Sequence, residues 1–316
     1  MRKSLISLAV LSAFAVSSAA LAAEEAAKPA ESSISVTTNI GFVSDYYTRG
    51  VSQSWHKPAV QGGFDIAHSS GFYAGVWGSN ITPNTYPDAN VELDAYAGYN
   101  GSVAGVEGLG YTVGAIGYFY PGGSWKKYSY QGSPTQTPEG GRWDTYEANA
   151  GISYKWLSAK ASMTLGDWFG AEQKTGWTSS TKGSTYLELN AAIPTPVAGL
   201  TLIAHVGHLN VAGRLNPEFT SPCTANCAVT SPPNTNFPST SPSGAINPDY
   251  TDWKIGVSKA FKIANADGWN AGVYYVGNDN DSYWGSRGYG GTSFNGSYET
   301  KNLNDGRVVV TLGRSF

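Results

Sequence analysis

Residues 91–100 read VELDAYAGYN, and along this stretch apolar side chains alternate with polar or small ones. Residues 146–156, which read YEANAGISYKW, repeat the same rhythm. Successive side chains of a β-strand point to opposite faces, so each stretch has one apolar face and one face with charged or amide groups. A period of two therefore predicts β-strands rather than helices.

Ten further segments fit a strand pattern, which brings the expected total to twelve. The full set is 35–44, 60–67, 72–79, 91–100, 111–120, 146–156, 159–165, 185–192, 201–211, 252–261, 269–277 and 307–316. Alternation is weakest in 111–120 and 201–211, so the existence of these strands is better supported than their exact ends.

The connections between these segments alternate in length along the chain. The long ones are 45–59, 80–90, 121–145, 166–184, 212–251 and 278–306, and the short ones are 68–71, 101–110, 157–158, 193–200 and 262–268. An even number of strands with short periplasmic turns and long extracellular loops is typical of outer-membrane barrels. The predicted fold is therefore all-β, a transmembrane antiparallel up-and-down β-barrel of about twelve strands.

The composition agrees with this fold and excludes several others. Only 14% of residues are charged, against ~25% in soluble domains, while 13% are aromatic. Abundant aromatic residues exclude a disordered chain, and two cysteines exclude a disulfide scaffold. A mean hydropathy of -0.25 argues against a helical membrane protein, and a pI near 5.8 offers no basic surface for nucleic acid.

Aromatic residues gather at the ends of the predicted strands. They are Tyr99, Tyr146, Tyr154, Trp156, Trp253 and Trp269. Membrane barrels carry such girdles at both lipid–water interfaces, with the apolar strand faces turned to lipid. Aromatic residues at strand ends also pack the cores of soluble β-sandwiches, which remains the alternative. The parity of the loops favours the membrane barrel.

The N-terminus has the features of an export signal. Arg2 and Lys3 precede an apolar run over residues 5–16, and Ala20-Leu21-Ala22 forms an A-x-A cleavage sequence. These features predict a secretory signal peptide over residues 1–22, with cleavage near Ala22.

The rest of the chain is expected to form a disordered lead-in over 23–33 and one barrel domain over 34–316. The last strand ends at Phe316, and a terminal Phe on an alternating strand resembles the signal that barrel-assembly machinery reads. Arg314 departs from that signal, because its position is usually apolar. We therefore expect outer-membrane localisation, with the assembly machinery and outer-membrane lipid as partners.

Residues 44–81 read SDYYTRGVSQSWHKPAVQGGFDIAHSSGFYAGVWGSNI and carry a family resemblance. The matching pieces are Ser44-Asp45-Tyr46, Arg49-Gly50, Ser52-Gln53, 58–62, 71–75, Trp77, Ser79 and Asn80, continued by 91–94, Tyr96 and 98–99. This pattern resembles the Gcw-type family of proteobacteria, described as TorF-family porins; Thr48 stands where an aromatic residue is expected. The resemblance implies an outer-membrane porin-like barrel and names no solute.

The polar strand faces predict which side chains line the lumen. The expected pore-lining set is Arg49, Asp65, Glu92, Asp94, Glu147, Lys155, Lys160, Glu188 and Lys254. Its strand members hold more acids than bases, which suggests a slight preference for cations. Alternatively, these charges pair with one another across a closed lumen. Arg49 lies close to Asp45 in the chain and lines a constriction or ties down the first loop through an ion pair.

Sequence signals for catalysis or metal binding are weak. His205 and His208 are three apart on a strand and so point to opposite faces, and no nucleophile motif surrounds any serine. Residues 279–281 resemble a calcium loop but lack its following Gly and distal Glu. Cys223 and Cys227 are expected to form a disulfide in an exported protein. We predict no catalytic residues, metal or cofactor.

The expected function is a porin-like outer-membrane channel for passive diffusion of small hydrophilic solutes. The main alternative is a non-conducting barrel that acts structurally or binds a ligand or surface through its long loops. An outer-membrane enzyme is a third, weaker reading. The sequence points to no nucleic-acid partner and leaves the solute and the oligomeric state open.

Overall fold

The computed structural model describes residues 33–127, 140–215, 247–280, 289–292 and 298–316. The predicted signal peptide over 1–22, nearly all of the lead-in and the predicted Cys223–Cys227 disulfide lie outside the described residues.

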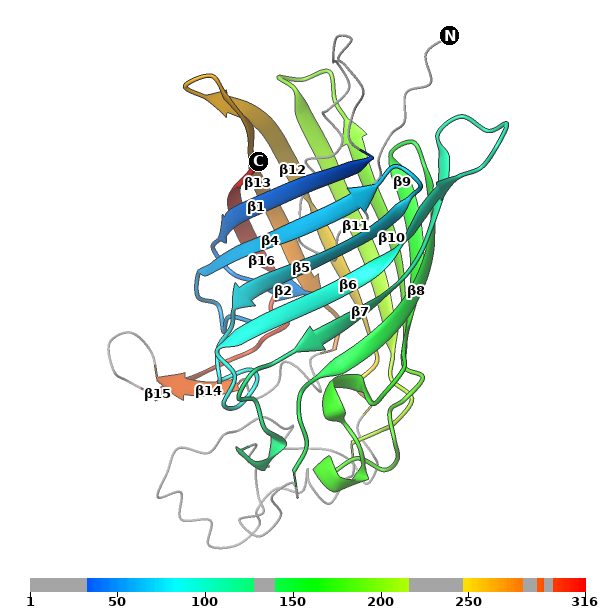
Figure 1. Ribbon diagram of the computed structural model, residues 1–316. Helices are drawn as coiled ribbons and strands as arrows, with labels where there is room; N and C mark the ends of the chain where they lie inside the picture. The colour runs from blue at the N-terminus through cyan, green and yellow to red at the C-terminus, as the bar shows by residue number, and fades with distance from the viewer. Residues whose placement is uncertain (1–32, 128–139, 216–246, 281–288, 293–297) are drawn as a thin grey trace, which may run out of the picture.

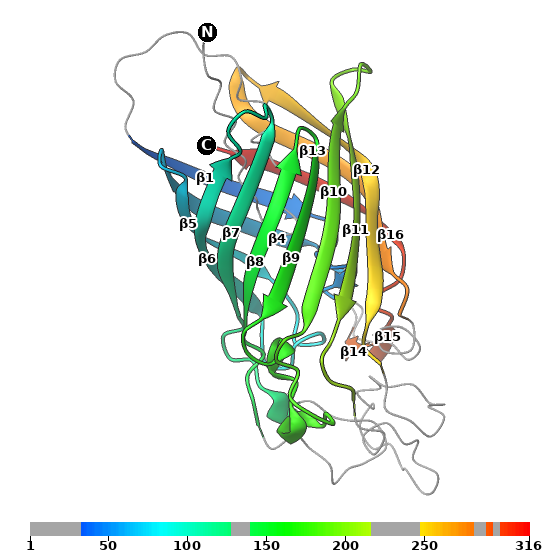
Figure 2. The ribbon, with the colours of Figure 1, turned by 90° about the vertical axis from the view of Figure 1, so that its right-hand side faces the viewer.

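Twelve antiparallel strands close into one barrel (Figures 1 and 2). They are β1 (Ile34–Val43), β4 (Ala59–His68), β5 (Phe72–Asn80), β6 (Val91–Ser102), β7 (Leu109–Phe119), β8 (Thr145–Tyr154), β9 (Leu157–Thr164), β10 (Thr185–Pro194), β11 (Leu200–Asn210), β12 (Tyr250–Ile263), β13 (Ala266–Asn278) and β16 (Arg307–Ser315). Each corresponds to one predicted segment, so the predicted barrel is confirmed.

The barrel closes where the first strand meets the last. β1 pairs with β4 on one side and with β16 on the other, where Phe42 lies opposite Leu312. Phe316 extends this pairing, since its backbone N–H donates to the Thr38 carbonyl at 2.9 Å. Closure leaves no free sheet edge, which a sheet surrounded by lipid requires. Any role of Phe316 as an assembly signal stays a prediction.

The two ends of the barrel differ, as the loop lengths predict. The short turns and the C-terminus lie at the upper end in Figure 1, and the long connections lie at the lower end. We call these the turn end and the loop end. The long connections contain elements that the sequence pattern did not predict: the hairpins β2 (Tyr47–Thr48) with β3 (Val51–Ser52) and β14 (Tyr289–Thr292) with β15 (Tyr298–Lys301), and the 3-10 helices η2 (Trp125–Lys127), η3 (Trp168–Gly170) and η4 (Gln173–Thr175).

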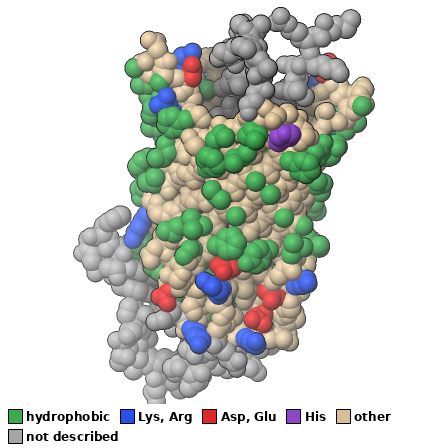
Figure 3. Space-filling view, viewed as in Figure 1, with side chains coloured by type: hydrophobic (Ala, Val, Ile, Leu, Met, Phe, Trp, Pro, Cys, Tyr) green, Lys and Arg blue, Asp and Glu red, His purple; other side chains and the backbone are tan. Residues whose placement is uncertain are grey.

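The outer face of every strand is apolar and exposed. One such residue from each strand is Ile40, Phe64, Val76, Leu93, Val113, Ile152, Met163, Leu187, Val206, Ile255, Val273 and Val310. Figure 3 shows hydrophobic side chains over the middle of this surface, with charged side chains gathered toward the loop end. A continuous apolar band on a closed barrel is a lipid-facing surface.

The residues of the predicted aromatic girdle lie near the ends of the barrel strands. Tyr146, Tyr154 and Trp156 are exposed. Tyr99, Trp253 and Trp269 are half-buried, at positions that alternate in step with the exposed apolar residues of β6, β12 and β13. No helix in the described ranges is long and apolar enough to cross a membrane.

Glycines on the inner face make room for tyrosine rings from neighbouring strands. A Cβ at Gly75 would lie 2.6 Å from the ring of Tyr96, and a Cβ at Gly98 would lie 2.6 Å from the hydroxyl of Tyr73. Tyrosines therefore lie along the wall instead of standing across the lumen. This packing accounts for part of the high glycine content, 39 residues.

We expect Gly98→Ala to destabilise the barrel by about 1–3 kcal/mol, because the new methyl group overpacks the wall. Its Cβ would lie 2.4 Å from the Val113 carbonyl oxygen as well as against Tyr73. Urea unfolding in lipid vesicles, followed by the gel mobility of unheated samples, measures the change. Gly166→Ala is the control, because no heavy atom lies within 4 Å of a Cβ there; equal midpoints for both variants would contradict the packing argument.

Candidate functional site

Most of the predicted lumen charges do lie on the inner face of the barrel. They are Asp65 on β4, Glu92 and Asp94 on β6, Glu147 on β8, Lys160 on β9, Glu188 on β10 and Lys254 on β12. Lys155 is the exception, and its predicted lumen position is wrong. β8 ends at Tyr154, and Lys155 sits exposed in the following turn with a φ of 52°, its ammonium over the Tyr154 ring.

The connection between β1 and β4 folds into the barrel instead of outward. We call residues 44–58 the inward segment. It contains the hairpin β2–β3, and its apolar side chains are buried, with Trp55 at 0% and Val51 at 2% exposed. The tip of the hairpin, at residues 49–50, lies against the wall: a Cβ at Gly50 would lie only 2.6 Å from the Cβ of Asp252 on β12. The inward segment therefore occupies the loop end of the lumen.

Arg49, at the tip of this hairpin, reaches the far wall. Its Nη1 and Nη2 donate to the two carboxylate oxygens of Glu147 at 2.8 and 2.7 Å. Its guanidinium carbon lies 4.1 Å from the ring centroid of Tyr186 on β10. In the closed order of strands, β8 and β10 each lie five strands from β1, in opposite directions around the barrel. One way passes β4, β5, β6 and β7, and the other passes β16, β13, β12 and β11. Arg49 thus bridges the lumen.

This bridge keeps Arg49 charged in a buried position. Burial alone would lower the pKa of the Arg49 guanidinium. The nearby Glu147 carboxylate acts in the opposite direction, and the pKa of Arg49 lies well above its ordinary value. The sequence left open a constriction or an ion pair for Arg49. The structure has an ion pair that crosses the lumen, and the partner is Glu147 rather than nearby Asp45.

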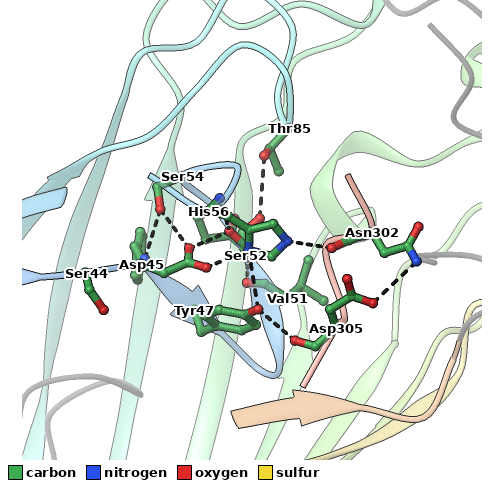
Figure 4. Close-up of polar contacts among 12 residues, drawn as sticks. Ser44, Asp45, Tyr47, Val51, Ser52, Ser54, His56, Thr85, Asn302 and Asp305 are labelled. Carbon is green, nitrogen blue, oxygen red and sulfur yellow. Dashed lines mark hydrogen bonds and ion pairs between the residues drawn. The ribbon is translucent and has the colours of Figure 1, made fainter. Parts of the chain in front are cut away.

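Asp45 instead anchors the base of the inward segment (Figure 4). Its carboxylate accepts from the hydroxyls of Ser52 at 2.6 Å and Ser54 at 3.0 Å, and it lies 2.6 Å from Nδ1 of His56. Nε2 of His56 lies 2.6 Å from the backbone carbonyl oxygen of Asn302. Both ring nitrogens thus face acceptors, which ties the inward segment to the last long connection.

The far wall carries acidic and basic side chains that contact one another on successive strands. Nζ of Lys160 lies 2.7 Å from Glu188, and His205 lies 2.9 Å from Asp252. Tyr186 donates to Asp252 at 2.9 Å beneath the Arg49 guanidinium. Acidic and basic side chains of this wall therefore contact one another instead of facing open solvent.

Aromatic rings fill the loop end around the inward segment. This aromatic cluster comprises Tyr46, Trp55, Trp77, Tyr86, Tyr118, Tyr120, Trp125, Trp143, Trp168, Trp177, Tyr186 and Tyr250. Trp125 stacks on Trp143 with centroids 3.9 Å apart, and Tyr86 packs on Tyr120 at 4.4 Å. Such packing excludes water, so the loop end is closed in this conformation.

Beyond Glu147, toward the turn end, the wall becomes polar and more open. A cavity of about 30 Å³ is lined there by Tyr96, Glu147, Asn149 and Lys160, among others. That volume is enough for about two water molecules. The lumen thus has two parts: an aromatic closure at the loop end and a polar chamber wall toward the turns.

Sequence reasoning missed several residues of this interior. Asp252 shares the inner face of β12 with Lys254, which the sequence did assign to the lumen, so the same alternation could have identified Asp252. His205 was considered only as a metal ligand. It lies inside and His208 outside, as the strand period requires, so His205 could have been assigned to the lumen.

A family model described as "Bacterial protein of unknown function (Gcw_chp)" matches residues 26–221. That range is more than half of the 316 residues. The chain belongs to this family. The resemblance carried by residues 44–81 is thereby confirmed. No curated protein matches the chain by sequence.

Three solved structures illustrate what the fold is similar to. The NanC porin has 10% identity and a TM-score of 0.42, with 89% of this chain and 99% of that chain covered. The outer membrane protein OprD from Pseudomonas aeruginosa has 10% identity and a TM-score of 0.33, with 89% and 64% covered. Acinetobacter baumannii OccAB2 has 6% identity and a TM-score of 0.36, with 82% and 55% covered.

Replacing Arg49 by Ala should release the inward segment, because it leaves the buried Glu147 carboxylate without its cation. Losing one partner of a buried pair costs about 3–5 kcal/mol. We expect amide hydrogen exchange across residues 45–56 to accelerate at least tenfold in Arg49→Ala, measured by mass spectrometry on protein in lipid. Arg142→Ala is the control, since the Arg142 side chain is 72% exposed in its pair with Asp144. Unchanged protection of 45–56 in Arg49→Ala would contradict the bridge.

Proposed function

We propose that this protein is an outer-membrane channel for the passive diffusion of small hydrophilic solutes, and that the inward segment limits its conduction. The observation that carries the proposal is the charged inner wall. Asp65, Lys160, Glu188 and Lys254 line the lumen, while the outer surface of the barrel is apolar. This is the arrangement of a water-filled pore.

The inward segment gives this channel its constriction. Bonds at its tip and base hold it: the Arg49 bridge to Glu147, and the Asp45–His56 contacts with their link to Asn302. It is a connection between strands rather than part of the closed sheet, so its movement would leave the strand pairing intact. The movement would break further links to the wall, such as the bond at 2.9 Å that Nδ2 of Asn278 donates to the Gly50 carbonyl oxygen. The closed conformation therefore corresponds to a resting channel that opens when the bridge is released.

A second candidate is a non-conducting barrel that acts structurally or binds a ligand or surface through its loops. The observation in its favour is the aromatic cluster, in which Trp55 and Tyr120 are 0% and 1% exposed. Rings packed this tightly suit a permanent closure as well as a resting one. Conduction separates the two candidates.

Export and assembly complete the proposal. The leader over residues 1–22 would direct the chain across the inner membrane, and Phe316 at the end of the closing strand would be read by the barrel-assembly machinery. Outer-membrane lipid would then surround the apolar band. In this proposal the chain has no catalytic residue, metal or cofactor.

Planar-bilayer recordings test the channel directly. We expect small, infrequent conductance steps from the wild-type protein and larger or longer ones from Arg49→Ala, because that variant frees the tip of the inward segment. Arg142→Ala should behave like the wild type. If neither the wild type nor Arg49→Ala conducts, although both shift gel mobility as folded barrels, the channel proposal fails and the non-conducting barrel is favoured.

A further inference from the structure

Two carboxylates on β6 differ from the other acids inside the barrel. Glu92 and Asp94 lie two residues apart on the inner face and are 1% and 3% exposed. Oε1 of Glu92 accepts from Tyr120 at 3.2 Å, but Oε2 of Glu92 and Oδ1 of Asp94 have no hydrogen-bond partner. Burying a carboxylate without a partner is unfavourable unless a cation or further hydrogen bonds compensate for the lost water.

The other buried acids of the interior each lie within ion-pair distance of a basic side chain of this chain. The ion pairs are Arg49–Glu147, His56–Asp45, Lys160–Glu188 and His205–Asp252. Within the described ranges, none of the ion pairs includes Glu92 or Asp94. Within the described residues, the chain therefore supplies no ion-pair partner for these two carboxyl groups.

Aromatic rings frame the pair on both sides. Asp94 lies opposite Trp77 on β5 and opposite Tyr118 on β7. From the inward segment, Tyr46 packs on Trp77 with centroids 5.5 Å apart. Burial first, and then the charges of Glu92 and Asp94, raise the pKa of Tyr46 well above its ordinary value, so its ring stays neutral beside the two acids.

This chemistry favours an organic cation over a metal ion. Calcium takes six to eight oxygen ligands and magnesium keeps a rigid octahedral shell. Across the described residues, no group of three or more His, Cys, Asp or Glu side chains could hold a metal. A carboxylate beside Trp and Tyr faces instead suits an alkylammonium group, which combines an ion pair with cation–π contact.

We propose that Glu92 and Asp94, framed by Trp77, Tyr118 and Tyr46, form a binding site for the ammonium group of small organic cations. The inference rests on the proposed channel and deepens it, because it names small amines as the preferred solute class. Tyr46 belongs to the inward segment, so an amine bound here contacts both the wall and the segment that closes the lumen. Occupation of the site and movement of the segment are then linked.

Isothermal titration calorimetry on the folded protein in detergent tests the site without requiring conduction. The probe is methylammonium chloride, with methanol as the neutral analogue and calcium chloride as the metal alternative. Both the wild type and Arg49→Ala are titrated. The inward segment is released in Arg49→Ala, so methylammonium can reach the site there even if the loop end of the wild type is closed. We expect saturable binding of methylammonium only.

The variant Glu92→Gln/Asp94→Asn should weaken methylammonium binding at least tenfold. Its matched control is Glu107→Gln/Asp267→Asn, which removes the same charge from two exposed positions at the turn end and should bind like the wild type. If the double variant does not fold, Asp94→Asn alone serves the same comparison. Equal affinity in wild type and variant, stronger binding of calcium, or no saturable binding in either background overturns the site.

The result also separates this inference from the channel. Methylammonium binding in a barrel that never conducts would support the site and refute the channel. Conduction by a wild type that binds no methylammonium would support the channel and refute the site.

Discussion

Charged side chains in the middle of the membrane span of this barrel have to point inward, because the outer face of each strand meets lipid. Charge on the lipid face costs about 2–4 kcal/mol at mid-bilayer depth. The inner wall therefore collects acids and bases at close range, and each needs a counter-charge or water. Arg49 supplies such a charge to Glu147 from a connection that enters the lumen, and this contact holds the tip of the inward segment against the far wall.

The interior consequently has two kinds of wall. On β8–β12 acidic and basic side chains follow one another from strand to strand, and Lys160 contacts Glu188 as His205 contacts Asp252. On β4–β6 the charged residues Asp65, Glu92 and Asp94 are all acidic. The inward segment lies between these walls with a basic tip toward one and aromatic rings toward the other. That asymmetry underlies the proposal that the closing element and the preferred solute are linked.

The strands were predictable because alternation is a local property of the chain, and all twelve barrel strands match their predicted segments. The inner side chains followed from the same period, except where a boundary moved: β8 stops at Tyr154, and the turn carries Lys155 out of register. Contacts across the lumen were not predictable. Arg49 and Glu147 are 98 residues apart, whereas the sequence placed Arg49 beside Asp45. The inward fold of residues 44–58 and the packing of tyrosines over glycines are likewise set by distant strands.

A double-mutant cycle on Arg49→Met and Glu147→Gln, read out by urea unfolding in lipid vesicles, tests most directly whether one ion pair holds the inward segment across the lumen. If it does, the pair behaves as a unit, and the double variant is destabilised by less than the sum of the two single variants. Strictly additive effects, within about 0.5 kcal/mol, would show that the two side chains do not interact and would contradict the bridge.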